Sequence, residues 1–195
     1  MLIDWWAVRS GRAQVENVAK PAVMVALIGV ALAADIDPTS AQPWIVAALI
    51  LGLAGDVFLL PRVDRFIEGL GAFLLGHLAY LVAFALAWSP GPLAVIGLVG
   101  VVVLLRVVGF DIVRSVTSSQ LRWPVTAYIC VTVAMVLLGT ATGRWLVAAG
   151  ALAFASSDGV LGSDRFVRPA PHRRHVVHIL YHVGQAAIVA GFIAT

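Results

Sequence analysis

Residues 43–60 read PWIVAALILGLAGDVFLL, and residues 70–88 read LGAFLLGHLAYLVAFALAW. Both stretches are nearly unbroken runs of apolar residues. An α-helix rises about 1.5 Å per residue, so each run is long enough to cross the roughly 30 Å hydrocarbon core of a bilayer. Inside lipid the backbone must satisfy its own hydrogen bonds, which excludes open sheet edges. The two stretches therefore predict membrane-spanning helices.

The composition of the whole chain agrees with this prediction. Of 195 residues, 61% are hydrophobic and only 12% are charged. In a typical soluble protein about half of the residues are hydrophobic and about a quarter are charged. The mean hydropathy is +0.98. No long polar linker divides the apolar runs, so we expect a single domain over residues 1–195. The predicted fold class is an all-α, polytopic transmembrane helical bundle of about seven spans, at residues 19–34, 43–60, 70–88, 92–108, 123–138, 145–161 and 175–193.

The basic residues indicate the orientation of the chain. Twelve of the 13 Lys and Arg residues lie before the first span or in alternate loops, and only Arg144 lies in the other loops. Because positive charge is retained on the cytoplasmic side, a multi-pass protein of the cell membrane is predicted, with the N-terminus and basic loops cytoplasmic and the C-terminus outside. The basic residues occupy short gaps between apolar runs, so the net charge of +3 does not indicate a nucleic-acid partner.

The two halves of the sequence resemble each other weakly. Four patterns recur at offsets of 100 to 103 residues: GDVFL at 55–59 with SDGVL at 157–161, DRF at 64–66 with DRF at 164–166, His77-x-x-Tyr80 with His178-x-x-Tyr181, and Lys20-Pro21 with Trp123-Pro124. This repetition predicts two parallel repeats of four helices each. The first helix of the first repeat is then largely missing, either because the chain starts late or because residues 1–8 are its remnant.

Two acids inside or next to apolar runs are the strongest candidates for chemistry. Asp56 and Asp158 occupy equivalent positions in the two repeats. A carboxylate at membrane depth is costly unless it faces a partner or water, so each is a functional candidate. The structural alternative is a carboxylate at a helix end, solvated by lipid headgroups. Their equivalence favours one shared site.

Further polar residues interrupt the apolar spans. His178, Tyr181 and Gln185 follow helical spacing with His182, so they share one face of the last helix, and His77 and Tyr80 lie one turn apart. For His77 or Tyr128 alone, an interhelical hydrogen bond is the structural alternative. Lys20 begins the first span, where it either extends to the headgroups or binds a phosphate.

The sequence contains no short zinc-ligand motif, and His178 with His182 at i, i+4 is a weak signal by itself. We therefore expect neither a metal nor another cofactor. A nucleophile elbow, a Walker loop and a dinucleotide fingerprint are also absent from the sequence, which argues against serine-hydrolase, ATPase and Rossmann functions.

Five motifs in fixed order resemble one known family. They are Lys20-Pro21-x-x-Met24, GDVFLL at 55–60, Gly71-x-Phe73-Leu74-Leu75-Gly76-His77-x-x-Tyr80, Gly150-Ala151-x-x-Phe154-x-x-Ser157-Asp158 and Tyr181-x-x-x-Gln185. Each motif is weak alone, but together the five are similar to the YhhN family of membrane proteins, which includes the animal lysoplasmalogenases. The resemblance covers nearly the whole chain from Lys20. Family members have about eight spans, so this chain departs from them by lacking most of the first.

The resemblance implies hydrolysis of the vinyl-ether bond at the sn-1 position of a lysoplasmalogen, a lysophospholipid of the membrane. The products are a fatty aldehyde and glycerophosphoethanolamine or glycerophosphocholine. This reaction needs an acid that protonates the alkenyl carbon and a base that activates water, roles that Asp56 and Asp158 can divide. His77, Tyr80, Tyr128, His178, Tyr181 and Gln185 are then supporting residues, and Lys20 holds the phosphate by its charge.

Three other functions fit the same residues. Another lipid hydrolase, including a metal-dependent one that acts on an ester or amide, is the nearest. A small proton-coupled transporter would use the buried acids as a relay. A purely structural bundle would use the polar residues to join its helices.

Overall fold

The computed structural model describes residues 1–60, 62–170 and 173–194. Within them the chain forms helices and one isolated antiparallel bridge between Ile36 and Ile193. The helices are α1 (Leu2–Arg9), α2 (Ala13–Ala33), the 3-10 turn η1 (Thr39–Ala41), α3 (Gln42–Phe58), α4 (Phe66–Leu86), α5 (Leu93–Leu104), the π-helical turn η2 (Leu105–Gly109), α6 (Phe110–Ser115), α7 (Ser119–Thr140), α8 (Trp145–Phe166) and α9 (Arg173–Phe192).

Seven segments of the described chain are long and apolar enough to cross a membrane. They correspond one to one with the seven predicted spans, so the prediction of a polytopic helical bundle is confirmed. The main difference is in the fourth span, predicted to end at residue 108, which continues through η2 and α6 to Ser115. The charges of Asp111 and Arg114 fall on this extension, so the last two turns of the helix do not appear as part of an apolar run in the sequence.

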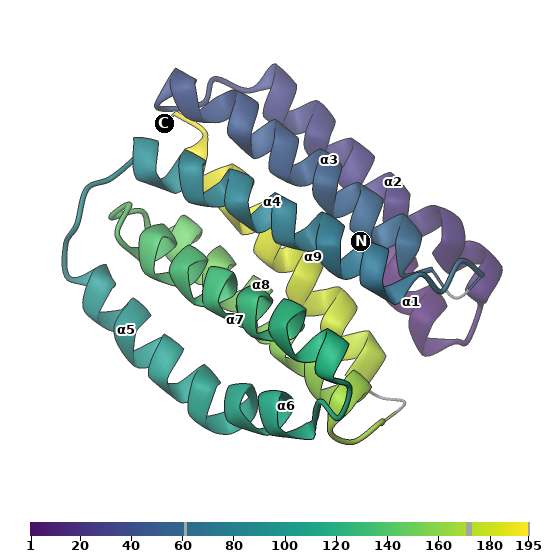
Figure 1. Cartoon of the computed structure of the whole chain (residues 1–195). Helices are drawn as coiled ribbons and strands as arrows, with labels where there is room; N and C mark the ends of the chain where they lie inside the picture. Colours follow the sequence, from purple (N-terminus) through teal and green to yellow (C-terminus); the bar gives the residue numbers. More distant parts are fainter. Residues whose placement is uncertain (61, 171–172, 195) are drawn as a thin grey trace.

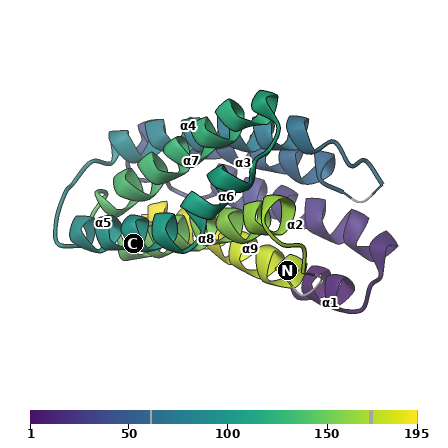
Figure 2. The ribbon, with the colours of Figure 1, turned by 60° about the horizontal axis from the view of Figure 1, so that its bottom comes forward.

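The seven long segments lie side by side (Figure 1), and a second view shows α3, α4 and α7 above α2, α8 and α9 (Figure 2). The closest helix pairs are α3 with α4 and α8 with α9, which occupy equivalent places in the two repeats. Glycine permits the second contact: a Cβ at Gly150 would lie 2.7 Å from the carbonyl oxygen of Gly184. Small residues let membrane helices approach closely in this way.

The two ends of the chain lie at opposite ends of the bundle (Figure 1). The C-terminal residues are held against the α2–α3 connection, where the amide of Ala194 donates to the carbonyl oxygen of Asp35. The short helix α1 packs against α2 and α9 at the other end. The side of the membrane assigned to each end of the chain stays a prediction.

Candidate active site

The candidate polar residues lie in three neighbouring clusters inside the bundle. The Asp158 cluster consists of Asp158, His77 and Tyr128. The Asp56 cluster consists of Asp56, Lys20, Tyr80, Tyr181 and Gln185. The α1 cluster consists of Asp4, Glu16, Arg174, His178 and His182.

The Asp158 cluster joins α4, α7 and α8. The hydroxyl of Tyr128 donates to Asp158 Oδ2 over 3.0 Å, and His77 Nε2 lies 3.1 Å from the same oxygen. His77 Nδ1 lies 2.7 Å from the carbonyl oxygen of Phe73. Since a carbonyl can only accept, Nδ1 carries the hydrogen.

This arrangement brings two atoms that can bind a proton, His77 Nε2 and Asp158 Oδ2, close together. With Nδ1–H directed to Phe73, a neutral His77 presents a lone pair at Nε2, and an ionised Asp158 would face it with another. Two acceptors 3.1 Å apart would repel, whereas a proton on either atom would make the contact favourable. Within the described residues, His77 Nε2 has no well-formed hydrogen bond of its own. The geometry thus places two groups that can exchange a proton side by side.

Asp158 is also the carboxylate that reaches open space. Its side chain is 12% exposed, whereas that of Asp56 is fully buried. Asp158 and Tyr128 line an open cavity between the α5–α6 span and helices α7 and α8, and its volume of about 750 Å³ includes space at its open side. Besides these two residues only Thr132 is polar, and the rest of the described lining is apolar or glycine.

The π-helical turn η2 forms one wall of this cavity. Leu105, Val108 and Gly109 of η2 line it, opposite Gly159 of α8. A Cβ at Gly159 would lie 3.0 Å from Val108 Cγ2, so the glycine allows η2 to approach α8 closely. Single π-turns inside membrane helices are frequent at functional sites.

The Asp56 cluster is more completely buried. Lys20 Nζ lies 3.0 Å from Asp56 Oδ1, and the two side chains are 9% and 0% exposed. The hydroxyl of Tyr80 donates to Gln185 Oε1. Neither Asp56 oxygen has a well-formed hydrogen bond within the described part of the chain. Buried oxygens of this kind are usually satisfied by ordered water.

Aromatic side chains lie between these two clusters. The ring of Phe154 contacts His77 on one side, with ring centroids 4.7 Å apart, and Tyr181 on the other, 5.2 Å apart. Phe73 packs edge-on against both Phe154 and Tyr181. Each aspartate thus has its own basic partner, Lys20 or His77, and no ion pair between described residues joins both aspartates.

The α1 cluster places His178 away from its repeat equivalent His77. His178 Nδ1 lies 2.8 Å from Asp4 Oδ2, and His182 Nδ1 lies 3.5 Å from the same oxygen. Glu16, which is also buried, accepts a hydrogen bond from Arg174. Asp4 lies outside the spanning segments. Burial raises the pKa of its carboxyl, but the hydrogen bond from His178 and nearby positive charges lower this pKa more, so it lies below 3.8.

Asp4 and Glu16 were not among the predicted site residues, although the sequence held a signal for each. Asp4 interrupts the apolar stretch LIDWWAV, and Glu16 lies four residues before Lys20 and so on the same helix face. His182 had been seen only as part of the stripe on α9. Among the described residues, no group of three or more His, Cys, Asp or Glu side chains is arranged to hold a metal ion.

Comparisons with known proteins come from sequence alone, since no solved structure matches this chain. Lysoplasmalogenase TMEM86B of Homo sapiens is 34% identical over 144 residues, which cover 72% of this chain and 59% of the human protein. Lysoplasmalogenase of Mycobacterium tuberculosis is 33% identical over 193 residues, which cover 94% of this chain and 72% of that protein. The chain thus spans less than two thirds of the human relative.

The sequence pattern of the YhhN family matches residues 15–192, which include all seven spans and both aspartates but not α1. Together with the identity to the mycobacterial protein over nearly the full chain, this match confirms the resemblance carried by the five motifs. The chain belongs to the YhhN family.

Proposed function

We propose that this protein is a membrane-embedded lipid hydrolase that cleaves the sn-1 vinyl-ether bond of lysoplasmalogens. The names of its relatives support the reaction. The observation that carries the proposal is the His77–Asp158 pair, which lies at the side of an apolar cavity and in this mechanism shares one proton. The cavity suits a single lipid chain, and the pair suits a bond that is cleaved after protonation.

The first step is proton transfer to carbon. The proton of the His77–Asp158 pair passes from Asp158 to the alkenyl carbon that is not bonded to oxygen. The carbon–carbon double bond supplies the electron pair, and the positive charge is shared between the adjacent carbon and the ether oxygen as an oxocarbenium ion. The carboxylate left on Asp158 stabilises this charge, and Tyr128 continues to donate to it.

The second step adds water. A water molecule attacks the oxocarbenium carbon and gives its proton to Asp158, which restores the starting state of the pair. The resulting hemiacetal then collapses: its hydroxyl loses a proton as the C=O bond of the aldehyde forms, and its bond to the ether oxygen breaks. The ether oxygen takes up that proton and leaves as the glycerol hydroxyl. The products are a fatty aldehyde and the glycerophospho headgroup. One carboxyl group can therefore act first as acid and then as base, as in retaining glycosidases.

The division of acid and base between Asp158 and Asp56 stays a prediction. The geometry favours Asp158 as the group that reaches the substrate, because Asp158 lines the cavity while Asp56 is fully buried against Lys20. The positive charge of Lys20 is likewise directed to Asp56, so phosphate binding by this lysine requires the ion pair to open. In this mechanism Asp56 holds Lys20 and orders the neighbouring cluster.

The test is aldehyde release from a defined lysoplasmalogen by the purified protein in detergent. We expect Asp158→Asn and His77→Gln to reduce kcat by about 10²- to 10⁴-fold, the usual contribution of a general acid or base. A lysophospholipid ester of the same chain length and headgroup identifies the bond cleaved, and an EDTA arm shows any dependence on a metal. Asp56→Asn measures the role of the second aspartate.

Each outcome has a distinct meaning. Aldehyde release that survives EDTA and is lost in folded Asp158→Asn supports the proposal. If Asp56→Asn is also inactive while folded, the acid and base are divided between the two aspartates. Release of fatty acid from the ester, stopped by EDTA, would indicate a metal-dependent esterase. Proton-coupled flux without any product would indicate a transporter.

A further inference from the structure

The apolar cavity beside Asp158 ends at a wall contributed by three helices. Val101 of α5, Val136 of α7 and Ala155 of α8 line the cavity and are 5%, 1% and 5% exposed. They form a separate apolar cluster, supported by partly buried residues such as Leu104 and Leu152. The cavity does not continue past them.

Two glycines on α5 explain why the cavity ends there. A Cβ on Gly97 would lie 2.0 Å from Thr140 Oγ1, and one on Gly100 would lie 2.6 Å from a methyl group of Leu152. The backbone of α5 therefore lies directly against side chains of α7 and α8 beyond the wall. On the other side of Val101, η2 begins and the helices separate enough to leave the cavity.

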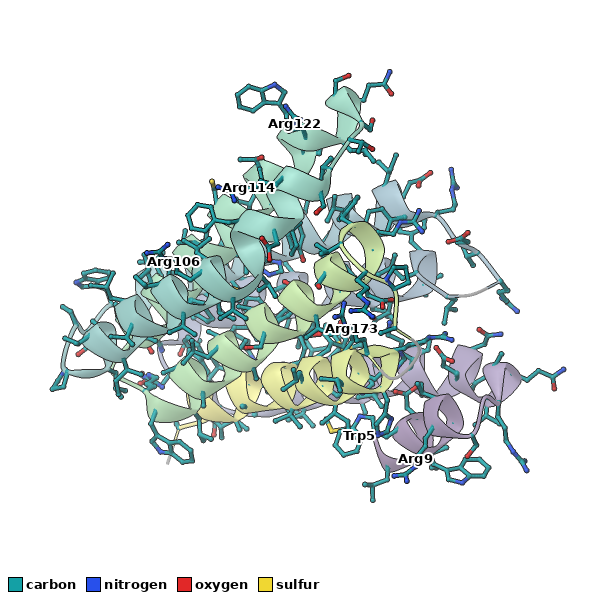
Figure 3. All side chains as sticks on the ribbon, turned by 90° about the horizontal axis from the view of Figure 1, so that it is seen from below. Trp5, Arg9, Arg106, Arg114, Arg122 and Arg173 are labelled. Carbon is teal, nitrogen blue, oxygen red and sulfur yellow. The ribbon has the colours of Figure 1, made fainter. Side chains whose placement is uncertain are left out.

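The opposite end of the cavity has a different character. Phe66 lines it there, and the guanidinium of Arg165 lies 4.7 Å from the Phe66 ring centroid. Arg114 and Arg122 are both exposed, and in the view from below they lie along the α6–α7 edge of the molecule (Figure 3). Positive charge at one end and a closed apolar wall at the other orient a phospholipid with its headgroup toward the arginines and its chain toward Val101.

We infer that Val101, Val136 and Ala155 select the substrate by the length of its alkenyl chain. The inference rests on the proposed function and names the part of the same site that receives the chain. Ala155 lies three residues from Asp158 on α8, and Val136 lies eight residues from Tyr128 on α7. The wall is therefore about 5 to 12 Å from the Asp158 cluster along the helix axes.

Selection by this wall is steric. A chain that arrives from the bilayer or a detergent micelle is already in an apolar medium, so each methylene group gains little on entering the cavity. An alkenyl chain longer than the cavity must displace the wall or bend away from it. Overpacking an apolar site in this way costs free energy, so the longer lipid binds less tightly. The size of the three wall residues therefore sets the longest chain that binds without strain.

Neighbouring residues on α5 provide a matched test. Val101→Phe fills the end of the cavity, while Val102→Phe adds the same ring at a position that is 51% exposed on the outer surface. With lysoplasmalogens of increasing chain length, we expect Val101→Phe to reduce kcat/KM about tenfold or more for the longest chains, and less than about twofold for the shortest. The control Val102→Phe should retain the wild-type dependence on chain length.

A smaller substitution keeps the inference testable if Val101→Phe does not fold. Val101→Ala removes two methyl groups from the wall, so the preferred chain length should increase. If folded Val101→Ala and Val101→Phe both keep the wild-type dependence on chain length, the inference is wrong. This holds even if the overall rate of hydrolysis changes in these variants.

Binding separates this inference from the proposed function. Lysophospholipids with a saturated ether in place of the vinyl ether cannot be hydrolysed by the proposed mechanism, and their binding can be followed by the thermal stability of the protein. If their chain-length dependence changes in Val101→Phe while no lysoplasmalogen is cleaved, the wall is confirmed and the reaction is wrong. If lysoplasmalogens are cleaved but neither binding nor kcat/KM depends on the wall, the reaction stands and the inference fails.

Discussion

At the scale of single residues, the same side-chain type has different surroundings in the two repeats. Asp56 and Asp158 are equivalent in sequence, yet one pairs with Lys20 inside the protein and the other with His77 at a cavity. The repeat-related histidines also differ, because His178 contacts Asp4 of α1. Repetition in the sequence thus identifies important positions without assigning them the same role.

Tyr128→Phe tests the hydrogen bond to Asp158. Phenylalanine retains the ring but removes the donor, which leaves the carboxylate formed after proton transfer less stabilised. A hydrogen bond to a charged group contributes about 1.5 to 3 kcal/mol, so we expect kcat to fall by about 10- to 100-fold with little change in KM. Steady-state kinetics with a lysoplasmalogen gives both values. Unchanged kcat would show that Tyr128 does not act on the reaction.

At the scale of helices, close packing depends on glycine at a few positions. A Cβ at Gly150 would lie within 2.8 Å of backbone atoms of α9, including the carbonyl oxygen of Gly184. Gly150→Ala must therefore push α8 and α9 apart, at a cost of about 1 to 3 kcal/mol. We expect a lower Tm in detergent. Gly29→Ala is the matched control, since nothing lies within 4 Å of the added carbon, and it should not lower Tm.

Helix α1 is attached to the bundle through Asp4. The folded pKa of Asp4 is below its ordinary value of 3.8, so its ionised form stabilises the docked helix. This stabilisation is present above about pH 4 and is lost as the pH falls through the folded pKa. Asp4→Asn should remove it at all pH values above that range.

Hydrogen exchange measures this effect directly. Amides of residues 2–9 should exchange faster in Asp4→Asn than in the wild type at neutral pH, while the two proteins should converge at low pH. Asp35→Asn, at an exposed aspartate in the α2–α3 connection, is the control and should behave as the wild type. Equal protection of α1 in all three proteins at neutral pH would contradict the role given to Asp4.

At the scale of the whole molecule, the predicted orientation can be tested by labelling. Cys130 is the only cysteine, so a Cys130→Ser protein accepts single new cysteines. Ser89 and Ser118 are both exposed, in loops at opposite ends of the spans. We expect a membrane-impermeant maleimide to label Ser89→Cys in intact cells and Ser118→Cys only after lysis. The reverse pattern would invert the assigned topology.

The sequence by itself determined the helical class, the seven spans and the family, because these depend on local hydrophobicity and on the spacing of short motifs. It also identified both aspartates, since an acid in an apolar run is conspicuous. Which base pairs with which acid was decided only by the tertiary structure. Partners such as His77 and Asp158 lie 81 positions apart and on different helices, and the direction of their side chains depends on how those helices pack.

The cavity likewise exists only in three dimensions. Its walls come from α4, α5, η2, α6, α7 and α8, and the apolar residue types that line it also face lipid elsewhere in the chain. Hydrophobicity alone does not separate the two groups, because lipid and protein interior are equally apolar. The π-turn and the close contacts of the α5 glycines with α7 and α8 decide which apolar residues line the cavity and which face lipid. Both features arise only when the helices are packed together.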